Sequence, residues 1–210
     1  MELKNFDQLV STVKGMDAKR VVAVAAAADA HVIESVLEAK NEGIAQPILV
    51  GDGEKIREIL NKLGETAEFP LVEEKDPVLC ARKAVELVRQ GKADFLMKGI
   101  LGTADLMRAV VDKEQGLRKG SLLSHVMVYE VPGFSRLLYL TDGGMNTYPD
   151  LEQKAQILEN AAQVCHAMGM EKINAACVCG AEVVNPKIQA TVDADALAQD
   201  TCLLYTSRCV

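Results

Sequence analysis

Tryptophan is absent from this chain of 210 residues, and aromatic residues make up only 4% of it. A buried core must therefore be built from Val, Leu, Ile, Ala and Met side chains. Hydrophobic residues account for 49% of the chain and charged residues for 25%, which is ordinary for a globular protein. The length is enough for one large domain or two small ones.

Several classes of partner leave no trace in the sequence. The net charge is -7 and no run rich in Lys or Arg occurs, so we expect no nucleic-acid partner. No apolar stretch approaches the length of a membrane span, and the first twenty residues are charged throughout, without the apolar core of a signal peptide. We therefore expect a cytoplasmic protein with no membrane partner.

The usual metal and nucleotide motifs are also missing. Cys177 and Cys179 are too close for a usual zinc site and have no matching His or Cys pair, so we expect no metal site. Buried reduced thiols, on one face of a strand, are the expectation for this pair. Neither the P-loop spacing nor G-x-G-x-x-G occurs before a predicted helix.

Strand-like and helix-like segments alternate along the first half of the chain. Apolar runs predict strands within residues 20–29, 48–50, 68–74 and 94–97, and helical periodicity lies between them. Asp76 and Pro77 mark one helix start, as N-cap and first residue. Such alternation predicts a layered α/β/α fold with a mostly parallel sheet.

The pattern changes in the second half. Residues 124–131 and 135–140 are predicted strands with only a short turn between them, which indicates an antiparallel hairpin and hence a mixed sheet. A long helix is predicted from Asp150 to about Met168, then a strand at 174–179 and a short helix at 194–198. The change near residue 142 is the predicted domain boundary.

A first candidate anion site follows the strand at 94–97. Lys98 and Gly99 end that strand, and a helix is predicted to begin with Thr103 as N-cap and to carry Arg108. A helix N-terminus with nearby cations suits phosphate or the phosphates of CoA. Arg118, which lies in a loop, is a further candidate for meeting an anion. A surface Lys and a solvated Arg are the alternative interpretation.

A second candidate site lies on the loop after the strand at 135–140. Asp142 and Asn146 stand between that strand and the next helix, at the kind of strand end where α/β folds bind ligands. They are also ordinary turn residues. Ser124 and His125 precede the paired strand, and His125 is a candidate for either a site or a structural role.

Three segments carry a resemblance to a known family: MKGILGTADLMRAVVDKEQGLRKGSLLSHV, RLLYLTDGGMNTYPDLEQKAQILENA and AEVVNPKIQATVDADALA. In order and in detail they resemble the phosphate acetyl/butyryltransferases, with the butyryl branch the nearer of the two. The resemblance implies two α/β domains with an architecture like that of isocitrate and isopropylmalate dehydrogenases. It also implies the reaction acyl-CoA + phosphate ⇌ acyl phosphate + CoA, with CoA as a substrate and no cofactor.

The resemblance also implies a substrate-binding set and a division of the chain. The residues expected to bind CoA or phosphate are Lys98, Gly99, Thr103, Arg108, Arg118, Ser124, His125, Asp142 and Asn146. Residues 1–142 would form the first domain, without its closing segment, and residues 143–199 the start of the second. Gly143 and Gly144 stand where relatives tend to carry bulkier apolar residues, which predicts a more flexible loop.

The last expectation concerns the end of the chain. Residues 200–210 do not match the family, whose C-terminal Ser, Arg and Asp segment would supply the catalytic groups, so no catalytic residue is assigned. We expect a truncated and inactive chain from an enzyme that is a homo-oligomer when complete. The alternatives are a phosphate acetyltransferase, a metal-dependent dehydrogenase of the same architecture, and a fragment without enzymatic activity.

Overall fold

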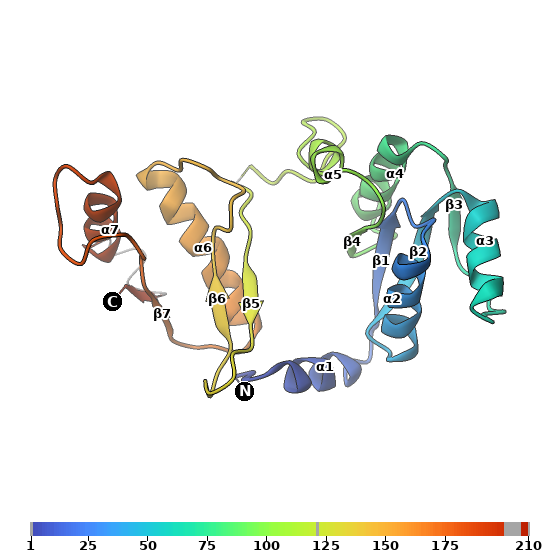
Figure 1. Ribbon diagram of the computed structural model, residues 1–210, viewed down its shortest axis with the longest axis horizontal. Helices are drawn as coiled ribbons and strands as arrows, with labels where there is room; N and C mark the ends of the chain where they lie inside the picture. Colours follow the sequence, from blue (N-terminus) through green and yellow to red (C-terminus); the bar gives the residue numbers. More distant parts are fainter. Residues whose placement is uncertain (1, 121, 200–206, 210) are drawn as a thin grey trace. The chain divides into compact units, whose positions relative to one another are not determined.

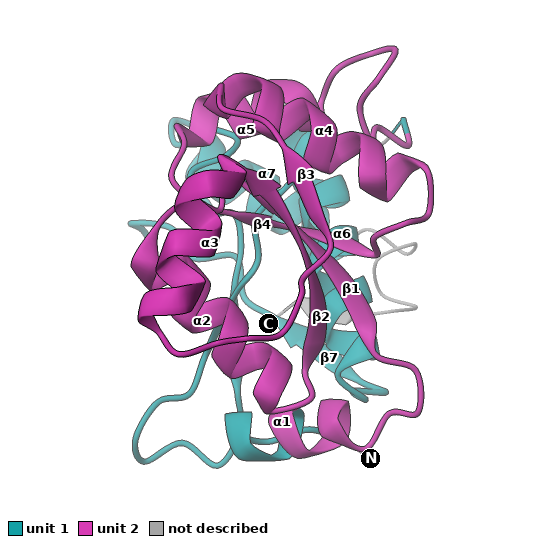
Figure 2. Ribbon diagram, turned by 90° about the vertical axis from the view of Figure 1, so that its right-hand side faces the viewer, with its two compact units in different colours: residues 1–9, 120–210 teal, residues 10–119 magenta. Residues whose placement is uncertain are grey.

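The computed structural model describes residues 2–120, 122–199 and 207–209. The chain forms two compact units (Figure 2), unit 1 from residues 1–9 and 120–210 and unit 2 from residues 10–119. Helix α1 (Phe6–Lys14) begins in unit 1 and ends in unit 2. These units divide near residue 120 and not near residue 142, and the domain boundary of the complete protein stays a prediction.

Unit 2 is a parallel sheet covered by helices (Figure 1). The strands lie in the order β3-β2-β1-β4 and every neighbouring pair is parallel. The strands are β1 (Arg20–Ala25), β2 (Ala45–Gly51), β3 (Leu71–Glu73) and β4 (Phe95–Lys98). The helices are α2 (Ala30–Asn41), α3 (Gly53–Lys62), α4 (Pro77–Arg89) and α5 (Thr103–Val110). The predicted α/β fold with a mostly parallel sheet is confirmed.

The core of unit 2 follows from the alternation of side chains along β1. Val22 and Val24 point to one face and pack with residues of α2 and α3, whereas Ala23 and Ala25 point to the other face and pack with Cys80 and Ala84 of α4. Both faces of a parallel sheet are buried in this way, so its strands read as nearly continuous apolar runs. The buried side chains of these two clusters are aliphatic or cysteine.

Aspartates cap three helices of unit 2, and the prediction of Asp76 as one of them is confirmed. Asp29, Asp52 and Asp76 are N-caps whose carboxylates accept backbone N–H groups, and Pro77 begins α4. The N-cap of α5 is Gly102, without a side-chain hydrogen bond, and Thr103 is the first helical residue. The prediction of Thr103 as N-cap is therefore wrong by one residue, because the glycine supplies the extended backbone at the cap.

Unit 1 contains two small sheets and two helices. Strands β5 (Met127–Tyr129) and β6 (Leu138–Leu140) form the predicted antiparallel hairpin. The hairpin is a two-stranded sheet of its own in the described residues and does not extend the parallel sheet. Strand β7 (Ile173–Ala175) pairs in parallel with β8 (Ser207–Cys209). The helices are α6 (Leu151–Ala167) and α7 (Gln189–Gln199).

The described cysteines fall into a buried pair and a partly buried pair. Cys80 and Cys165 are buried free thiols, and burial raises the pKa of each. Cys177 and Cys179 follow the short strand β7 and are only partly buried, so the prediction of a buried pair on a strand is wrong. The predicted strand ends early because Val178 is 92% exposed, as a loop residue and not a core residue.

No helix among the described residues is long and apolar enough to cross a membrane. No group of three or more His, Cys, Asp or Glu side chains within residues 2–120 and 122–199 is arranged to hold a metal ion.

Candidate functional site

The carboxyl end of strand β4 is tied closely to that of β1. Gly99 N–H donates to Ala25 O at 2.8 Å, and Ile100 N–H donates to Ala26 O at 3.0 Å. A Cβ atom at position 99 would collide with the carbonyl oxygens of Ala25 and Ala26. Gly99 is therefore needed for the close approach of two backbones at this edge of the sheet.

Lys98 is exposed and folds back on its own turn. Its Nζ donates to Leu101 O at 3.1 Å and to Gly99 O at 3.3 Å. These bonds hold the turn between β4 and α5 and leave the ammonium group at the surface. The geometry fits a turn that presents one positive charge at the carboxyl edge of the sheet.

The first turn of helix α5 already carries an anion of its own. Asp105 lies on this turn, next to the Gly102 N-cap, and Arg108 Nη1 donates to Asp105 Oδ1 at 2.6 Å. The carboxylate complements the positive end of the helix dipole. Arg108 is thus held in an exposed ion pair, and an incoming phosphate would compete with Asp105 for it.

Arg118 differs from Arg108. It is exposed in the loop that ends unit 2, and the described part of the chain offers it no hydrogen bond or ion pair. Among the predicted cations of unit 2, Lys98 and Arg108 have partners within the chain. Arg118 is therefore the predicted cation whose charge is not already engaged.

In unit 1 the loop after β6 is closed by Asp142 and Asn146. Asp142 Oδ1 accepts from Met145 N at 3.1 Å, and Asp142 Oδ2 accepts from Asn146 N at 3.1 Å and from Asn146 Nδ2 at 2.5 Å. Asn146 Nδ2 also donates to Leu123 O at 3.0 Å. One amide therefore joins the loop to the segment before β5.

The Asp142 carboxylate is held in its ionised form. Burial alone would raise its pKa, but hydrogen bonds from the Asn146 side chain and from the backbone of Met145, Asn146 and His125 outweigh it, and the pKa lies below the ordinary value. At neutral pH the group is a charged acceptor that its own loop has satisfied. These hydrogen bonds join Asp142 to three donors of its own loop.

Ser124 and His125 lie beside this loop. Asn160 Nδ2 on α6 donates to Ser124 Oγ at 2.9 Å, and Thr141 Oγ1 donates to His125 O at 2.8 Å. The His125 side chain is exposed and its ring lies against Gly143. The structure therefore brings together the four predicted residues of unit 1: Ser124, His125, Asp142 and Asn146.

A groove of about 710 Å³ continues from the same loop within unit 1. Its walls are residues 147–151 and residues of α6 and α7, among them Pro149, Leu151 and Val192. Lys154 Nζ donates to the buried Asp193 carboxylate at 2.5 Å and so joins α6 to α7. Sequence spacing could not reveal this pair, because its members are far apart in the chain and adjoin only in the fold.

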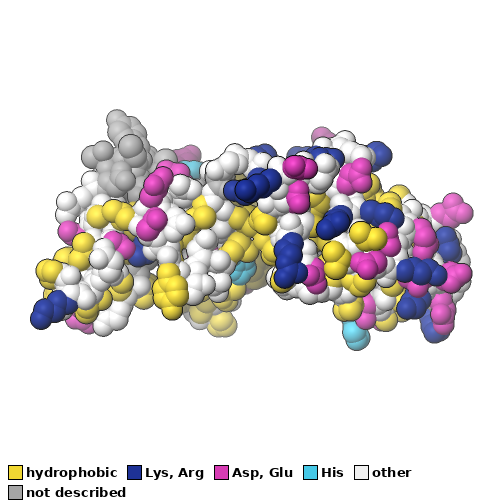
Figure 3. Space-filling model, turned by 90° about the horizontal axis from the view of Figure 1, so that it is seen from above, with side chains coloured by type: hydrophobic (Ala, Val, Ile, Leu, Met, Phe, Trp, Pro, Cys, Tyr) yellow, Lys and Arg dark blue, Asp and Glu magenta, His cyan; other side chains and the backbone are white. Residues whose placement is uncertain are grey.

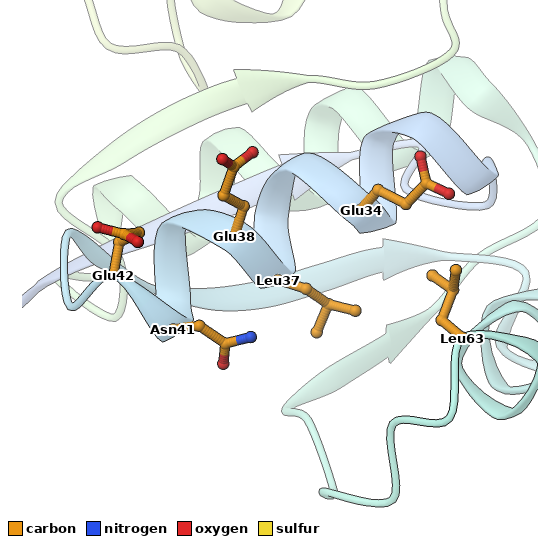
Figure 4. Close-up of a pocket in the computed structure, with 6 residues that line it drawn as sticks. All are labelled: Glu34, Leu37, Glu38, Asn41, Glu42 and Leu63. Carbon is orange, nitrogen blue, oxygen red and sulfur yellow. The ribbon is translucent and has the colours of Figure 1, made fainter.

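A second groove, of about 390 Å³, lies on unit 2 between α2 and the end of α3 (Figure 4). Glu34 and Glu38 of α2 and its C-cap Glu42 line it, and Leu37 points toward Leu63. Glu42 is paired with Lys14, but Glu34 and Glu38 leave the groove with a negative charge that repels anions, so it does not suit phosphate or CoA. Acidic and basic side chains are mixed over the face that Figure 3 shows.

Comparison with known proteins gives this arrangement a context. A sequence model described as phosphate acetyl/butaryl transferase matches residues 75–200, which include all nine predicted site residues. The chain belongs to this family.

Two curated members illustrate the similarity. The phosphate butyryltransferase of Clostridium acetobutylicum is 46% identical over 94% of this chain, and the phosphate acetyltransferase of Thermotoga maritima is 40% identical over 92%. The chain spans 65% of the length of each of these relatives.

A solved structure agrees with the family assignment. The branched-chain phosphotransacylase from Enterococcus faecalis V583 superposes with a TM-score of 0.75 at 26% identity, over 90% of this chain and 66% of that one. The resemblance noted in the sequence is therefore confirmed at the level of family and fold. The functional roles of individual residues of this chain stay predictions.

Proposed function

We propose that this chain is part of a phosphate acyltransferase that converts acyl-CoA and phosphate into acyl phosphate and CoA. The observation that carries the proposal is its membership of the phosphate acetyl/butaryl transferase family. The identity of 46% to a phosphate butyryltransferase, against 40% to a phosphate acetyltransferase, favours a butyryl-type acyl group. A pocket that differs by one methylene discriminates by only about 1–3 kcal/mol, so other short acyl groups are substrates to test.

In the forward direction a phosphate oxygen attacks the thioester carbonyl and forms the C–O bond of the acyl phosphate. The C–S bond breaks, and CoA leaves as a thiolate that takes up the proton lost by the phosphate. Such a reaction needs cations for the phosphate and CoA anions, and donors for the developing oxyanion. In unit 2, Arg118 and Lys98 are the exposed cations proposed to meet the anionic parts of the substrates. Arg108 would contribute when an anion displaces Asp105 from it.

In unit 1 the ordered Asp142–Asn146 loop is proposed to position His125 and Ser124 so that they face the substrates. Asp142 takes all of its donors from the loop and the segment before β5, so it needs no partner from the substrate. The adjoining groove has a volume within the range of about 300–1,000 Å³ that small-molecule sites occupy, and it supplies apolar walls for an acyl or pantetheine chain.

The test measures release of the CoA thiol from acetyl-, butyryl- and isobutyryl-CoA, with and without phosphate. It is carried out on the chain of 210 residues and on a chimera that continues after residue 199 with the remaining third of the Clostridium acetobutylicum relative. We expect phosphate-dependent release by the chimera, fastest with a four-carbon acyl group. The sequence-based expectation that the 210-residue chain alone is inactive is read from the same assay.

Two results would overturn the proposal. One is a chimera that binds CoA but gives no phosphate-dependent thiol release with any of the three thioesters. The other is turnover that depends on a divalent metal and a nicotinamide cofactor, which would favour the dehydrogenase alternative. The parent Clostridium acetobutylicum enzyme, assayed beside the chimera, serves as the control for the assay itself.

A further inference from the structure

Gly143 is the residue on which the His125 ring rests. A Cβ atom built on Gly143 would lie 2.8 Å from His125 Nδ1, closer than real Cβ atoms approach their neighbours, and 3.5 Å from Cε1 of the same ring, an ordinary contact distance. Met127 Cε lies between these two in distance, at 3.3 Å. The bare Cα of Gly143 thus provides the room in which one edge of the imidazole lies.

The backbone conformation does not explain a glycine at this position. Gly144 has a φ of 122°, in the region that favours glycine, whereas Gly143 is not among the residues with positive φ. An alanine at position 143 could keep the backbone as it is. What it could not keep is the present position of the His125 ring.

The rest of His125 is fixed by the neighbouring loop. Its carbonyl oxygen accepts from Thr141 Oγ1 at 2.8 Å, and its backbone N–H donates to the Asp142 carboxylate. Backbone bonds on both sides of the residue leave only the side-chain torsions free. The ring nitrogens have no hydrogen-bond partner within the described residues, so contact with Gly143 is what selects the ring's place.

We propose that Gly143 is a positioning residue that acts through His125. By leaving room for the imidazole, it holds the ring beside the Asp142–Asn146 loop, with its nitrogens available to a polar group of CoA or phosphate. This inference rests on the proposed function for its ligands, but the placement of the ring can be measured without any ligand.

The first test is the NMR signature of the ring in the 210-residue chain. The chain contains only three histidines, His31, His125 and His166, so labelling the imidazole Cε1 gives three signals, and His125→Ala identifies the relevant one. In Gly143→Ala we expect the His125 signal to shift and its NOE to residue 143 to change, with Tm unchanged within error, because an exposed side chain can move aside at little cost.

Gly144→Ala is the matched control. No atom lies within 4 Å of a Cβ built on Gly144, but its positive φ makes a side chain strained. We expect this variant to lower Tm and to leave the His125 signal in place. If Gly143→Ala leaves the His125 signal where it is, or lowers Tm as Gly144→Ala does, Gly143 is a structural turn residue and the proposal is overturned.

The second test is a double-mutant cycle on ligand affinity. CoA and inorganic phosphate are titrated separately into the wild type, Gly143→Ala, His125→Ala and the double variant. We expect Gly143→Ala to weaken binding three- to tenfold in the wild-type background and to have no further effect once His125 is alanine. An equal loss in both backgrounds would show that Gly143 does not act through the ring.

The two tests separate the failure of this inference from the failure of the proposed function. If neither CoA nor phosphate moves the wild-type His125 signal, the proposed ligands are wrong, and the claim that Gly143 positions the ring for them is overturned as well. If the ligands do move that signal but Gly143→Ala does not, the proposed function stands and the positioning role falls.

Discussion

Each of the two units is stabilised internally by a different kind of interaction. The seven largest fully buried side chains of the described residues all belong to unit 2: Ile33, Leu49, Ile56, Val24, Val50, Val85 and Cys80. Unit 1 has a smaller core around Ala162, Cys165 and Ile173, and exposes Tyr148 at 94% and Val183 at 73%. Its loops and helices are joined instead by polar side chains such as Asn146, Asn160 and Lys154.

This difference decides what a substitution does in each unit. Burial of apolar area is non-directional and tolerates small shifts, so unit 2 is a scaffold whose stability depends on volume. Hydrogen bonds need particular partners at particular distances, so the stability of unit 1 depends on specific donor–acceptor pairs. The polar candidate residues of unit 1 thus belong to the hydrogen-bond network of that unit. In unit 2 the candidate cations Lys98, Arg108 and Arg118 lie at the surface, and Gly99 is the candidate residue that the packing of the sheet requires.

The largest expected effect is a loss of volume in the core of unit 2. Leu49 is 1% exposed and packs between β1 and the helices on one face of the sheet. We expect Leu49→Ala to lower the free energy of unfolding by about 2–5 kcal/mol, measured by urea denaturation. Val78→Ala, at a residue that is 40% exposed in the same unit, should change it by less than about 0.5 kcal/mol. Similar losses for both variants would contradict the description of unit 2 as a volume-dependent scaffold.

The second prediction concerns the ion pair that joins α6 to α7. The hydrogen bond from Lys154, followed by that from Gln189, lowers the pKa of the buried Asp193. A carboxyl group with a lowered folded pKa adds stability above its unfolded pKa of about 3.9, and this stability is lost as pH falls through the folded value. We expect Lys154→Met to lower stability at pH 7 by about 1–3 kcal/mol, because it leaves a buried charge without its cation.

The pH dependence distinguishes this pair from a surface pair. Loss of the Lys154 donor raises the folded pKa of Asp193 toward its unfolded value, so this group contributes less pH-dependent stability. The stability of Lys154→Met should therefore fall less steeply below about pH 4 than that of the wild type. Lys62→Met, which breaks the exposed pair with Glu58, is the control and should leave the pH profile nearly unchanged. Profiles of unfolding free energy between pH 3 and 7 that coincide for Lys154→Met and the wild type would show that the pair contributes nothing.

The sequence predicted unit 2 better than unit 1, for the same physical reason. Apolar runs such as residues 20–25 and the N-cap pair Asp76 and Pro77 are local signals, and they agreed with the strands and with α4. The hairpin of β5 and β6 was also predicted, from two apolar runs that follow each other closely, but its strands have only three residues each and residues 130–137 separate them. Periodicity and capping describe neighbours in the chain, and these elements are formed by neighbours.

What the sequence missed depends on contacts between distant residues. The residues of Lys154–Asp193 and of Asn160–Ser124 are separated by more than thirty positions, and nothing in either segment indicates its partner. The pairing of Arg108 with Asp105 was within reach of the sequence, since residues three apart on a helix are neighbours. The helix at 194–198 was predicted too short, because its start at Gln189 lies in a polar segment without a strong cap signal.

The third prediction tests the polar network at the candidate site. Asn146→Ala removes the side-chain donor to Asp142 and the bond to Leu123 O, whereas burial, which raises the pKa of Asp142, remains. We expect the pKa of Asp142 to rise and stability at pH 7 to fall by about 1–2 kcal/mol. Asn160→Ala, which releases Ser124 and Leu122 O, should leave the pKa of Asp142 unchanged. NMR titration of the Asp142 carboxyl carbon measures this pKa in both variants. An equal rise of the pKa in Asn160→Ala would show that loss of the Asn146 side chain is not its cause.

The smallest expected effect on stability, and the sharpest on binding, is at the two arginines of unit 2. Both are exposed, so Arg108→Ala and Arg118→Ala should each change the free energy of unfolding by less than about 0.5 kcal/mol. Their effects on anions should differ, because Arg108 is already paired with Asp105 and Arg118 is not engaged. A phosphate that binds Arg108 must displace a carboxylate, and this competition cancels much of the attraction. We therefore expect Arg118→Ala to weaken CoA binding about tenfold, equivalent to about 1.4 kcal/mol, and Arg108→Ala to weaken it less.

Asp105→Asn is the matched variant: it frees Arg108 and should strengthen phosphate binding. Calorimetric titrations in which Arg108→Ala weakens binding more than Arg118→Ala does would contradict this order. They would mean that the Arg108–Asp105 ion pair opens when the substrate binds and that a phosphate replaces the Asp105 carboxylate on Arg108.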